Sequence, residues 1–444
     1  MEKSNKSATS NSTLLMFIAF VGIFLYGLLA ALPGSVLPTL ERNKFLPNDS
    51  AIGTFLLINA VGAVLAYLVS GPLIDRIGKK FALSFGTLLV LVSMLGFGLI
   101  VTSVQPAAAL VSIFAASFVL GLGANAIVAA GHALVADVAA NWRNSALNLL
   151  DICFGLGLAS LPLVVQTLQR RGGMGLIFWS LGLMALLVLL LVLTSRMPRS
   201  AHSEGLKAGN AAQLFKNPSF LLLAFALFMY VGAEVSVGKW VVTFMQRDPA
   251  ILASQGVDEA TLKLLSSTAD ESVSRFFEAD SVGYAVATYS YTTLTLFAMA
   301  LLLGRLVSSI LLGVFRFNSF LLITLGSLLT VASLLIAFNS SSALTVRIGL
   351  IAAGFGMGPI FPTSVGLASV MMPKLAGTAM SLVMGVGFAG LLVIPPAVGY
   401  VSSAVGGPAG NVRSGLTVVI AASIIMLVLH IVLVLRERTA IKTS

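Results

Sequence analysis

The sequence predicts an all-helical integral membrane protein, and three observations lead to that class. The chain of 444 residues is 58% hydrophobic and only 9% charged, whereas soluble domains carry about 25% charged residues. Apolar runs of about 20 residues recur along the whole chain, and each is long enough to cross roughly 30 Å of hydrocarbon. Short segments between these runs hold most of the lysines and arginines. The solvent of this chain is therefore lipid, which it crosses many times as helix.

The apolar runs define twelve expected membrane spans. The first is longer than the core of a signal peptide and lacks a small-residue cleavage site, so we expect it to be retained. A polar linker at 196–217 follows the sixth span, and this spacing suggests two related halves with a site between them. The expected spans are 14–38, 51–73, 81–104, 108–136, 145–168, 175–195, 219–246, 283–315, 319–338, 344–372, 376–402 and 413–435.

The same pattern predicts the domain organisation. Two six-helix bundles cover 14–195 and 218–436, with short tails at 1–13 and 437–444. A loop at 247–280 carries seven carboxylates against three basic residues. We expect this loop to be a solvated, partly helical extracellular segment.

The distribution of lysine and arginine predicts the orientation in the membrane. Because the number of spans is even, both termini lie on one side, and the segments on that side hold the larger share of basic residues. The positive-inside rule places that side in the cytoplasm, so we expect a multi-pass protein of the cytoplasmic membrane. The net charge of +10 then reflects topology and not a nucleic-acid surface. A single cysteine, Cys153, excludes an internal disulfide.

One short motif lies between the second and third spans, where residues 71–80 read GPLIDRIGKK. It resembles the G-x-L-x-D-R-x-G-R/K-K/R signature of the major facilitator superfamily. The resemblance implies a major-facilitator fold, with twelve helices in two six-helix bundles around a central cavity. It also implies a gating role, in which a glycine permits close helix approach and an aspartate pairs with a basic group or a helix N-terminus. The residues of this gating motif are Gly71, Asp75, Arg76, Gly78, Lys79 and Lys80.

Longer stretches are similar to the fucose–proton symporter family of sugar permeases. They include residues 131–164, YVGAEVSVGKW at 230–240 and GMGPIFPTSVGLAS at 356–369. The resemblance implies a sugar or related polyol that is carried with a cation. This chain departs from the family at three positions, because His132 replaces the usual Asn, Asp151 replaces a frequent His, and Val128 stands where an acid is often found. The family's substrate and ion therefore do not transfer directly.

Four charged residues lie well inside the expected spans, and ionisable groups at such depth are functional candidates. Asp151 lies about six residues, or ~9 Å, from the inner end of its span, and His132 has a similar depth in the preceding span. A carboxylate and an imidazole so placed can exchange a proton or form a permanent tie between two helices. Glu234 and Arg305 are expected near the midplane as a fixed or switchable ion pair. Lys239 either extends to the outer interface or belongs to the site.

Neutral polar and aromatic side chains complete the candidate site, because solute pockets place a few polar groups in an apolar wall. In a membrane the same groups also serve as contacts between helices. Asn148 shares the helix face of Asp151. Trp240 can stack on a sugar ring or lie at the membrane interface. The remaining candidates are Asn125, Tyr26 and Tyr230.

These observations together predict a secondary active transporter and not an enzyme. The expected solute is small and polar, with a monosaccharide as the leading candidate, carried by alternating access with H⁺ or Na⁺. A proton-coupled exporter of drug-like amphipathic molecules remains the alternative. The sequence has no phosphate-binding loop, no nucleophile elbow and no histidines at metal-ligand spacing. We therefore expect no cofactor or metal beyond the coupling ion, and a monomer whose partners are the solute and the bilayer, without nucleic acid.

Overall fold

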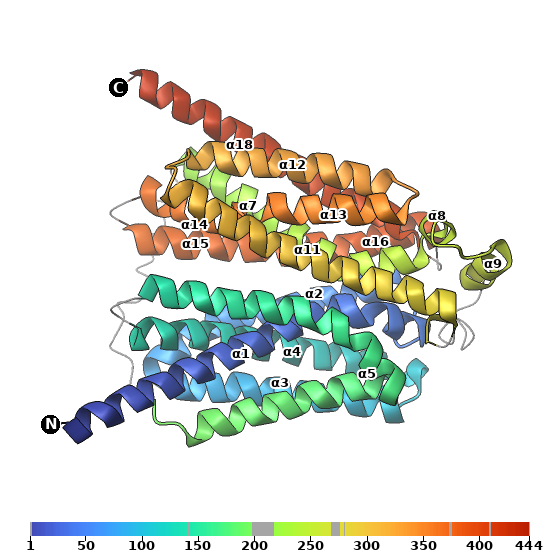
Figure 1. Ribbon diagram of the computed structural model, residues 1–444, viewed down its shortest axis with the longest axis horizontal. Coiled ribbons are helices and arrows are strands. Elements are labelled where there is room, and N and C mark those ends of the chain that lie inside the picture. Colours follow the sequence, from blue (N-terminus) through green and yellow to red (C-terminus); the bar gives the residue numbers. More distant parts are fainter. Residues whose placement is uncertain are drawn as a thin grey trace. The chain divides into compact units, whose positions relative to one another are not determined.

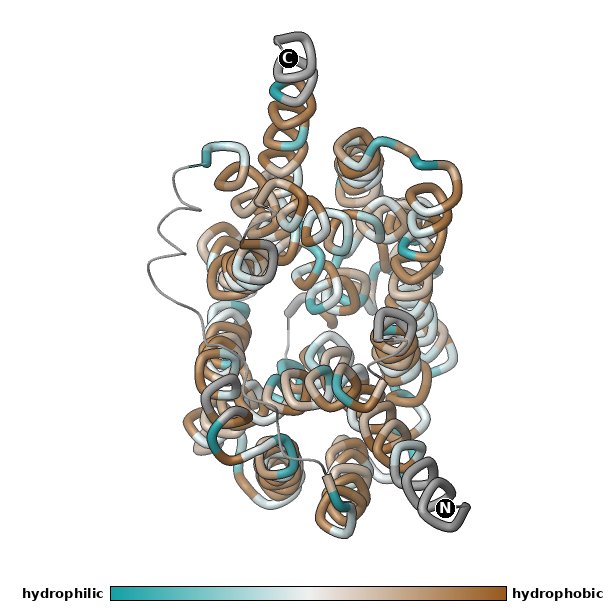
Figure 2. Tube along the Cα trace, turned by 90° about the vertical axis from the view of Figure 1, so that its left-hand side faces the viewer, coloured by the Kyte–Doolittle hydropathy of each residue, from teal (hydrophilic) through white to brown (hydrophobic). Residues whose placement is uncertain are grey.

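The computed structural model describes residues 2–139, 143–197, 217–267, 276–278, 280–372, 375–407 and 410–443. Within these ranges all regular structure is helical, which confirms the predicted fold class (Figure 1). Eleven helical segments of the described residues are long and apolar enough to cross a membrane. Figure 2 shows that hydrophobic residues dominate most turns of these helices. The chain is therefore a multi-pass membrane protein.

The chain divides into two compact units. The N-terminal unit comprises Met1–Leu46 and Ile58–Glu204, and the C-terminal unit comprises Pro47–Leu57 and Gly205–Ser444. The first unit holds α1 (Glu2–Arg42), most of α2 (Asp49–Arg76), α3 (Lys79–Ser103), α4 (Pro106–Val138) and α5 (Arg143–Thr194). The second holds α7 (Pro218–Arg247), α8 (Pro249–Ala253), α9 (Glu259–Ser267), α11 (Ser281–Gly313), α12 (Ser319–Asn339), α13 (Ala343–Met357), α14 (Ile360–Met371), α15 (Ala376–Ala389), η3 (Gly390–Leu392), α16 (Ile394–Gly406), α17 (Val412–Gly415) and α18 (Thr417–Thr443).

The difference between twelve expected spans and eleven helical segments lies in α5. Its apolar part, Leu149–Thr194, has 46 residues, which is about 70 Å of helix and more than twice the thickness of the hydrocarbon. The backbone is not helical at Gly172 (φ −155°, ψ 24°) and Gly173 (φ 65°, ψ −171°). These glycines fall between the expected spans 145–168 and 175–195, so α5 contains both of them.

Helix α1 begins at Glu2, whereas the sequence predicted a polar tail through residue 13. No glycine or proline interrupts the polar residues before the first span, so the helix continues through them. The part of α1 that is apolar enough to cross a membrane begins at Ser12, close to the expected start. Pro33 and Pro38 lie inside α1 without ending it.

The C-terminal unit contains two interrupted spans. The expected span 344–372 is divided into α13 and α14 at Gly358 and Pro359. The expected span 376–402 passes through η3 and resumes as α16, whose second and third residues are Pro395 and Pro396. Proline cannot donate a backbone hydrogen bond, so both helices restart at these positions. Helix α7 is the central element, in contact with α11, α14, α15, α16 and α18.

The acidic loop after α7 is partly helical, as its composition suggests. Asp248 accepts hydrogen bonds from the backbone at the start of α8. Asp258 accepts bonds from the hydroxyl and the backbone N–H of Thr261 at the start of α9, and these bonds lower the pKa of its carboxyl group. Residues 268–275 of this loop and residues 198–216 of the predicted linker lie outside the described ranges.

Candidate functional site

An imidazole and a carboxylate meet within the N-terminal unit. The Nε2 atom of His132 lies 3.4 Å from Oδ1 of Asp151, and the two side chains are 37% and 57% exposed. His132 lies in α4, about 9 Å before its end at Val138, and Asp151 lies about 12 Å after the start of α5. The pair therefore lies in two membrane-spanning helices, and neither side chain is buried.

The contacts of His132 determine what a hydrogen bond to Asp151 requires. The other ring nitrogen, Nδ1, lies 2.9 Å from the backbone carbonyl oxygen of Val128, which only accepts, so Nδ1 carries the hydrogen. In neutral histidine Nε2 is then an acceptor and cannot donate to a carboxylate. The contact with Asp151 therefore requires one additional proton, held either by the imidazole or by the carboxyl group.

Three aromatic and polar side chains lie together in the same unit. The hydroxyl of Tyr26 in α1 donates to Oδ1 of Asn125 in α4 at 3.4 Å. The ring of Tyr26 stacks on Phe154 of α5 with centroids 5.3 Å apart. Asn125 donates its amide hydrogen to the carbonyl of Gly121 at 2.8 Å. The predicted candidates Tyr26 and Asn125 therefore join the same helices that carry His132 and Asp151. The side chain of Asn148 lies outside the described residues.

The basic residues of the predicted gating motif hold helix ends together. Lys79, at the start of α3, is buried and forms an ion pair with Asp137 at the end of α4. The Nζ atom of Lys80 donates to the carbonyls of Leu193 and Ser195, each at 2.7 Å. Cations are favourable there because the last carbonyls of α5 carry the negative end of its dipole.

For the other residues of the gating motif, the structure shows no polar side-chain contact among the described residues. Gly78 precedes α3 with a φ of 112°, a conformation that favours glycine. Arg76 is exposed. The burial of Gly71 and the side chain of Asp75 lie outside what the structure describes, so a pairing of Asp75 stays a prediction.

A second charged pair lies within the C-terminal unit. Arg305 in α11 has its Nη2 atom 3.7 Å from Oε1 of Glu234 in α7. The two side chains are only 24% and 18% exposed. Tyr230, one turn before Glu234, is fully buried beside both charges. The structure therefore brings together three of the predicted residues, at the centre of α7.

Trp240 does not offer a face to a solute in this structure. The side chain is fully buried, and its indole N–H donates to the carbonyl of Pro395 in α16 at 3.0 Å. The prediction of a stacking or interfacial tryptophan did not account for this bond. This bond connects α7 with the first turn of α16.

Sequence reasoning missed a buried carboxylate at the start of α2. Asp49 is 1% exposed, and its carboxylate pairs with Nη1 of Arg247 at 2.5 Å and accepts from the hydroxyl of Ser402. Gly53 and Gly399 permit this approach, since a Cβ on Gly399 would lie 3.0 Å from the Cα of Gly53. All of these residues belong to the C-terminal unit. Asp49 precedes the expected span 51–73, so its depth in the membrane gave no reason to select it.

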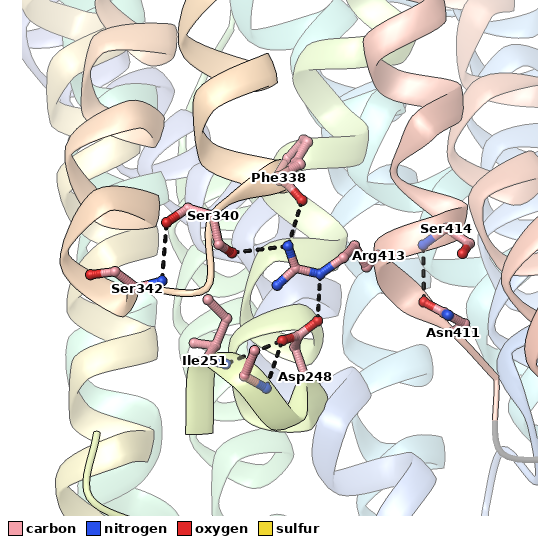
Figure 3. A network of polar contacts seen from close by, with 9 residues as sticks. Asp248, Ile251, Phe338, Ser340, Ser342, Asn411, Arg413 and Ser414 are labelled. Carbon is pink, nitrogen blue, oxygen red and sulfur yellow. Dashed lines mark hydrogen bonds and ion pairs between the residues drawn. The ribbon is translucent and has the colours of Figure 1, made fainter. Parts of the chain in front are cut away.

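A second network of polar contacts surrounds Arg413 of α17, next to the end of α7 (Figure 3). Its Nε atom donates to Asp248 at 2.7 Å, and Nη1 donates to the carbonyls of Phe338 and Ser340 at 2.8 and 2.9 Å. The guanidinium also lies 5.2 Å from the ring centroid of Phe244. These bonds connect the ends of α7 and α12 with α17, so Arg413 has a structural role in this unit.

We expect Asp49→Ala to lower the thermal stability of the purified protein markedly. Removing one partner of a buried ion pair costs about 3–5 kcal/mol, because the other charge stays buried. The double variant Asp49→Ala/Arg247→Met should recover part of that loss. Thermal unfolding in detergent measures both effects. Glu259→Ala is the control, because its pair with Lys263 is 83% and 77% exposed and should contribute little. Equal midpoints for Asp49→Ala and Glu259→Ala would contradict a stabilising role of this pair.

Comparisons with known proteins identify a matching family model and several similar proteins. The Major Facilitator Superfamily model matches residues 19–254. Bypass of stop codon protein 6 of Saccharomyces cerevisiae is 22% identical over 428 residues, which cover 88% of this chain and 76% of that protein. The 4-hydroxybenzoate transporter PcaK of Pseudomonas aeruginosa is 29% identical over 189 residues, 42% of this chain and 40% of its own length. The crystal structure of a D-xylose–proton symporter superposes with a TM-score of 0.72 at 14% identity, over 95% of this chain and 97% of that one.

The family model spans more than half of the chain, and the helical fold agrees with it. The likeness to solved structures supports the fold, whereas the fucose–proton symporter resemblance receives no separate support from these comparisons. The chain is therefore a transporter of small solutes and a member of the major facilitator superfamily.

Proposed function

We propose that this protein is a secondary active transporter that couples the movement of a small polar solute to the movement of H⁺. The observation that carries the proposal is the pair of His132 and Asp151, whose contact requires one bound proton. Ionisable groups in membrane-spanning helices are functional candidates, and proton relays are among their roles. The pair provides a site that is stable only when protonated.

The coupling follows from what happens when this proton leaves. Without it, the Nε2 lone pair of His132 faces the negative oxygen of Asp151, and the two acceptors repel each other. Helices α4 and α5 then lose a contact that the protonated state possesses. If the solute binds more tightly to one of these two states, proton and solute movements become linked. Alternating access then releases both on the same side.

The chemistry of the pair favours H⁺ over Na⁺ as the coupling ion. Hard cations such as Ca²⁺ and Mg²⁺ are held by several oxygen ligands, and we expect Na⁺ to require the same. Asp151 has an imidazole nitrogen as its neighbour. A second carboxylate does not contact Asp151 among the described residues. We therefore propose a proton and not a metal ion at this position.

The solute that we propose is of monosaccharide size. The hydroxyl of Tyr26 and the amide of Asn125 lie on helices α1 and α4 of the unit that holds the proton pair, and such groups suit a hydroxylated solute. The D-xylose–proton symporter, which shares the fold, transports a solute of this kind. We also propose that both termini lie in the cytoplasm, since basic residues are concentrated in the segments on that side.

Transport by the purified protein in proteoliposomes tests this function. Uptake of a sugar from a panel of neutral and acidic monosaccharides should follow an imposed pH gradient and stop when a protonophore is added. A sodium gradient of equal size should have no effect. Uptake that persists with the protonophore, or that requires sodium, would contradict the proposal. Transport of amphipathic drugs in place of any sugar would favour an exporter.

A further inference from the structure

One face of α7 remains open in a helix that is otherwise enclosed. Between Met229 and Gln246 every residue is buried except Glu234, Val235, Gly238 and Lys239. The buried positions pack against the other helices of the C-terminal unit. The four open positions form a continuous face at helical spacing, and two of them are charged.

Lys239 has no partner for its charge in the described part of the chain. It forms neither a hydrogen bond nor an ion pair there. The next seven residues of α7 are buried, and the helix continues for about 12 Å beyond Lys239 to its end at Arg247. The lysine stem is too short to cover that distance, so the expected extension to the outer interface does not explain this residue.

An open volume lies beside this lysine. A Cβ atom on Gly238 would meet no other atom within 4 Å, although a glycine inside a helix costs about 1 kcal/mol relative to alanine. By contrast, a Cβ on Gly232 in the same helix would lie 2.7 Å from the Cβ of Ile394 and closer still to its Cγ1. Close helix packing therefore explains Gly232 but not Gly238, which leaves open space at the position directly before Lys239.

The charges on this face do not cancel. Glu234 is already paired with Arg305 at 3.7 Å. It also lies five positions before Lys239, and residues at that spacing do not face each other on a helix. Because the pair of Glu234 and Arg305 has no net charge, this face of α7 carries one unbalanced positive charge, that of Lys239. Because an isolated charge is costly in a protein interior within a membrane, an anion from outside the chain would stabilise it.

We propose that Lys239 binds the carboxylate of the transported solute, which is therefore an organic acid of about monosaccharide size. The inference rests on the proposed function, since it identifies the solute class of that transporter. The ammonium group supplies the charge, and the space at Gly238 admits the carboxylate. A neutral sugar would leave the charge of Lys239 without a counterion.

Matched pairs of solutes test this assignment on the intact protein. D-Glucuronate and D-glucose differ at the carboxylate, and so do D-galacturonate and D-galactose, while benzoate serves as a carboxylate without hydroxyl groups. Binding is measured by ligand-dependent thermal stabilisation in detergent. At least one carboxylate should bind, and its neutral counterpart should bind at least tenfold more weakly. Lys239→Met should weaken binding of that carboxylate at least tenfold, and Lys239→Arg should restore most of it.

Two controls separate binding from folding. Lys263→Met changes an exposed lysine, 77% accessible, on α9, and should bind like the wild type. Lys239→Met without ligand should unfold at the same temperature as the wild type or higher, because it removes an unpaired charge.

Equal binding of carboxylates to wild type and Lys239→Met, or no response to any carboxylate, would overturn the assignment. A neutral sugar that is still carried with protons would then leave the proposed function intact. Failure of every solute to follow the pH gradient would instead count against the function itself.

Discussion

Asp151→Asn should abolish the accumulation of solute against its gradient while leaving exchange of solute across the membrane intact. Asparagine resembles a permanently protonated carboxyl group, so the pair with His132 can form but can no longer release its proton. Binding and the change of access are then preserved, whereas the link to the proton gradient is lost.

The size of this effect follows from the energetics of the gradient. With one proton per solute, and without a membrane potential, a difference of one pH unit is worth about 1.4 kcal/mol and supports at most about tenfold accumulation. The wild type should approach that ratio in proteoliposomes. With the Asp151→Asn variant, the internal and external solute concentrations should become equal. Its counterflow of labelled solute should proceed at nearly the wild-type rate.

The matched control is Asp258→Asn, which makes the same substitution in the exposed loop before α9. The side-chain oxygen of asparagine can still accept the bond from the backbone N–H of Thr261 at 2.9 Å, so this variant should accumulate solute normally. Concentrative uptake by Asp151→Asn at the wild-type level would contradict the role of this carboxylate. Loss of both accumulation and exchange would point to a defect in folding or binding.

Gly157→Leu should prevent stable assembly of the N-terminal unit, and Gly157→Ala should destabilise it clearly. Helices α1 and α5 meet at Gly157 and Gly27. A Cβ on Gly157 would lie 3.0 Å from the Cα of Gly27 and within contact distance of the carbonyl oxygen of Phe24. Lipid offers no hydrophobic driving force between helices, so their association depends on such close packing. The helices would have to separate to admit a methyl group.

Overpacking of this kind costs about 1–3 kcal/mol for the alanine variant and more for leucine. Thermal unfolding in detergent and the yield of monodisperse protein measure it. Gly96→Ala and Gly96→Leu are the matched controls, because a Cβ on Gly96 in α3 would meet no atom within 4 Å. They should behave like the wild type or gain slightly in helix stability. Equal stability of the Gly157 and Gly96 variants would contradict the importance of this contact.

The fold was predictable because apolar runs of membrane length are a strong signal. The gating-motif resemblance indicated the family that the comparisons support. The sequence could not predict that α1 continues back to Glu2, or that Pro359 and Pro395 divide two spans in different ways. Those outcomes depend on packing around the freed backbone groups and not on hydropathy.

The candidate site was predictable in part. Depth along two consecutive spans was sufficient to place His132 near Asp151, and Glu234 near Arg305. Rotation of a helix about its axis is not encoded in hydropathy, so the sequence left open that Trp240 is buried and that Lys239 lies on an open face. The partners of Asp49 could not be predicted either, because Arg247 and Ser402 are distant from it in the sequence.

The central claim is that one proton enters the pair of His132 and Asp151 for each solute carried. The most direct test adds solute to proteoliposomes that contain a pH-sensitive dye and have no imposed ion gradient. Downhill solute entry should acidify the lumen with the wild-type protein. In proteoliposomes preloaded with unlabelled solute, Asp151→Asn should take up labelled solute by exchange without any change in pH. Solute entry by the wild type with a constant internal pH would contradict the account.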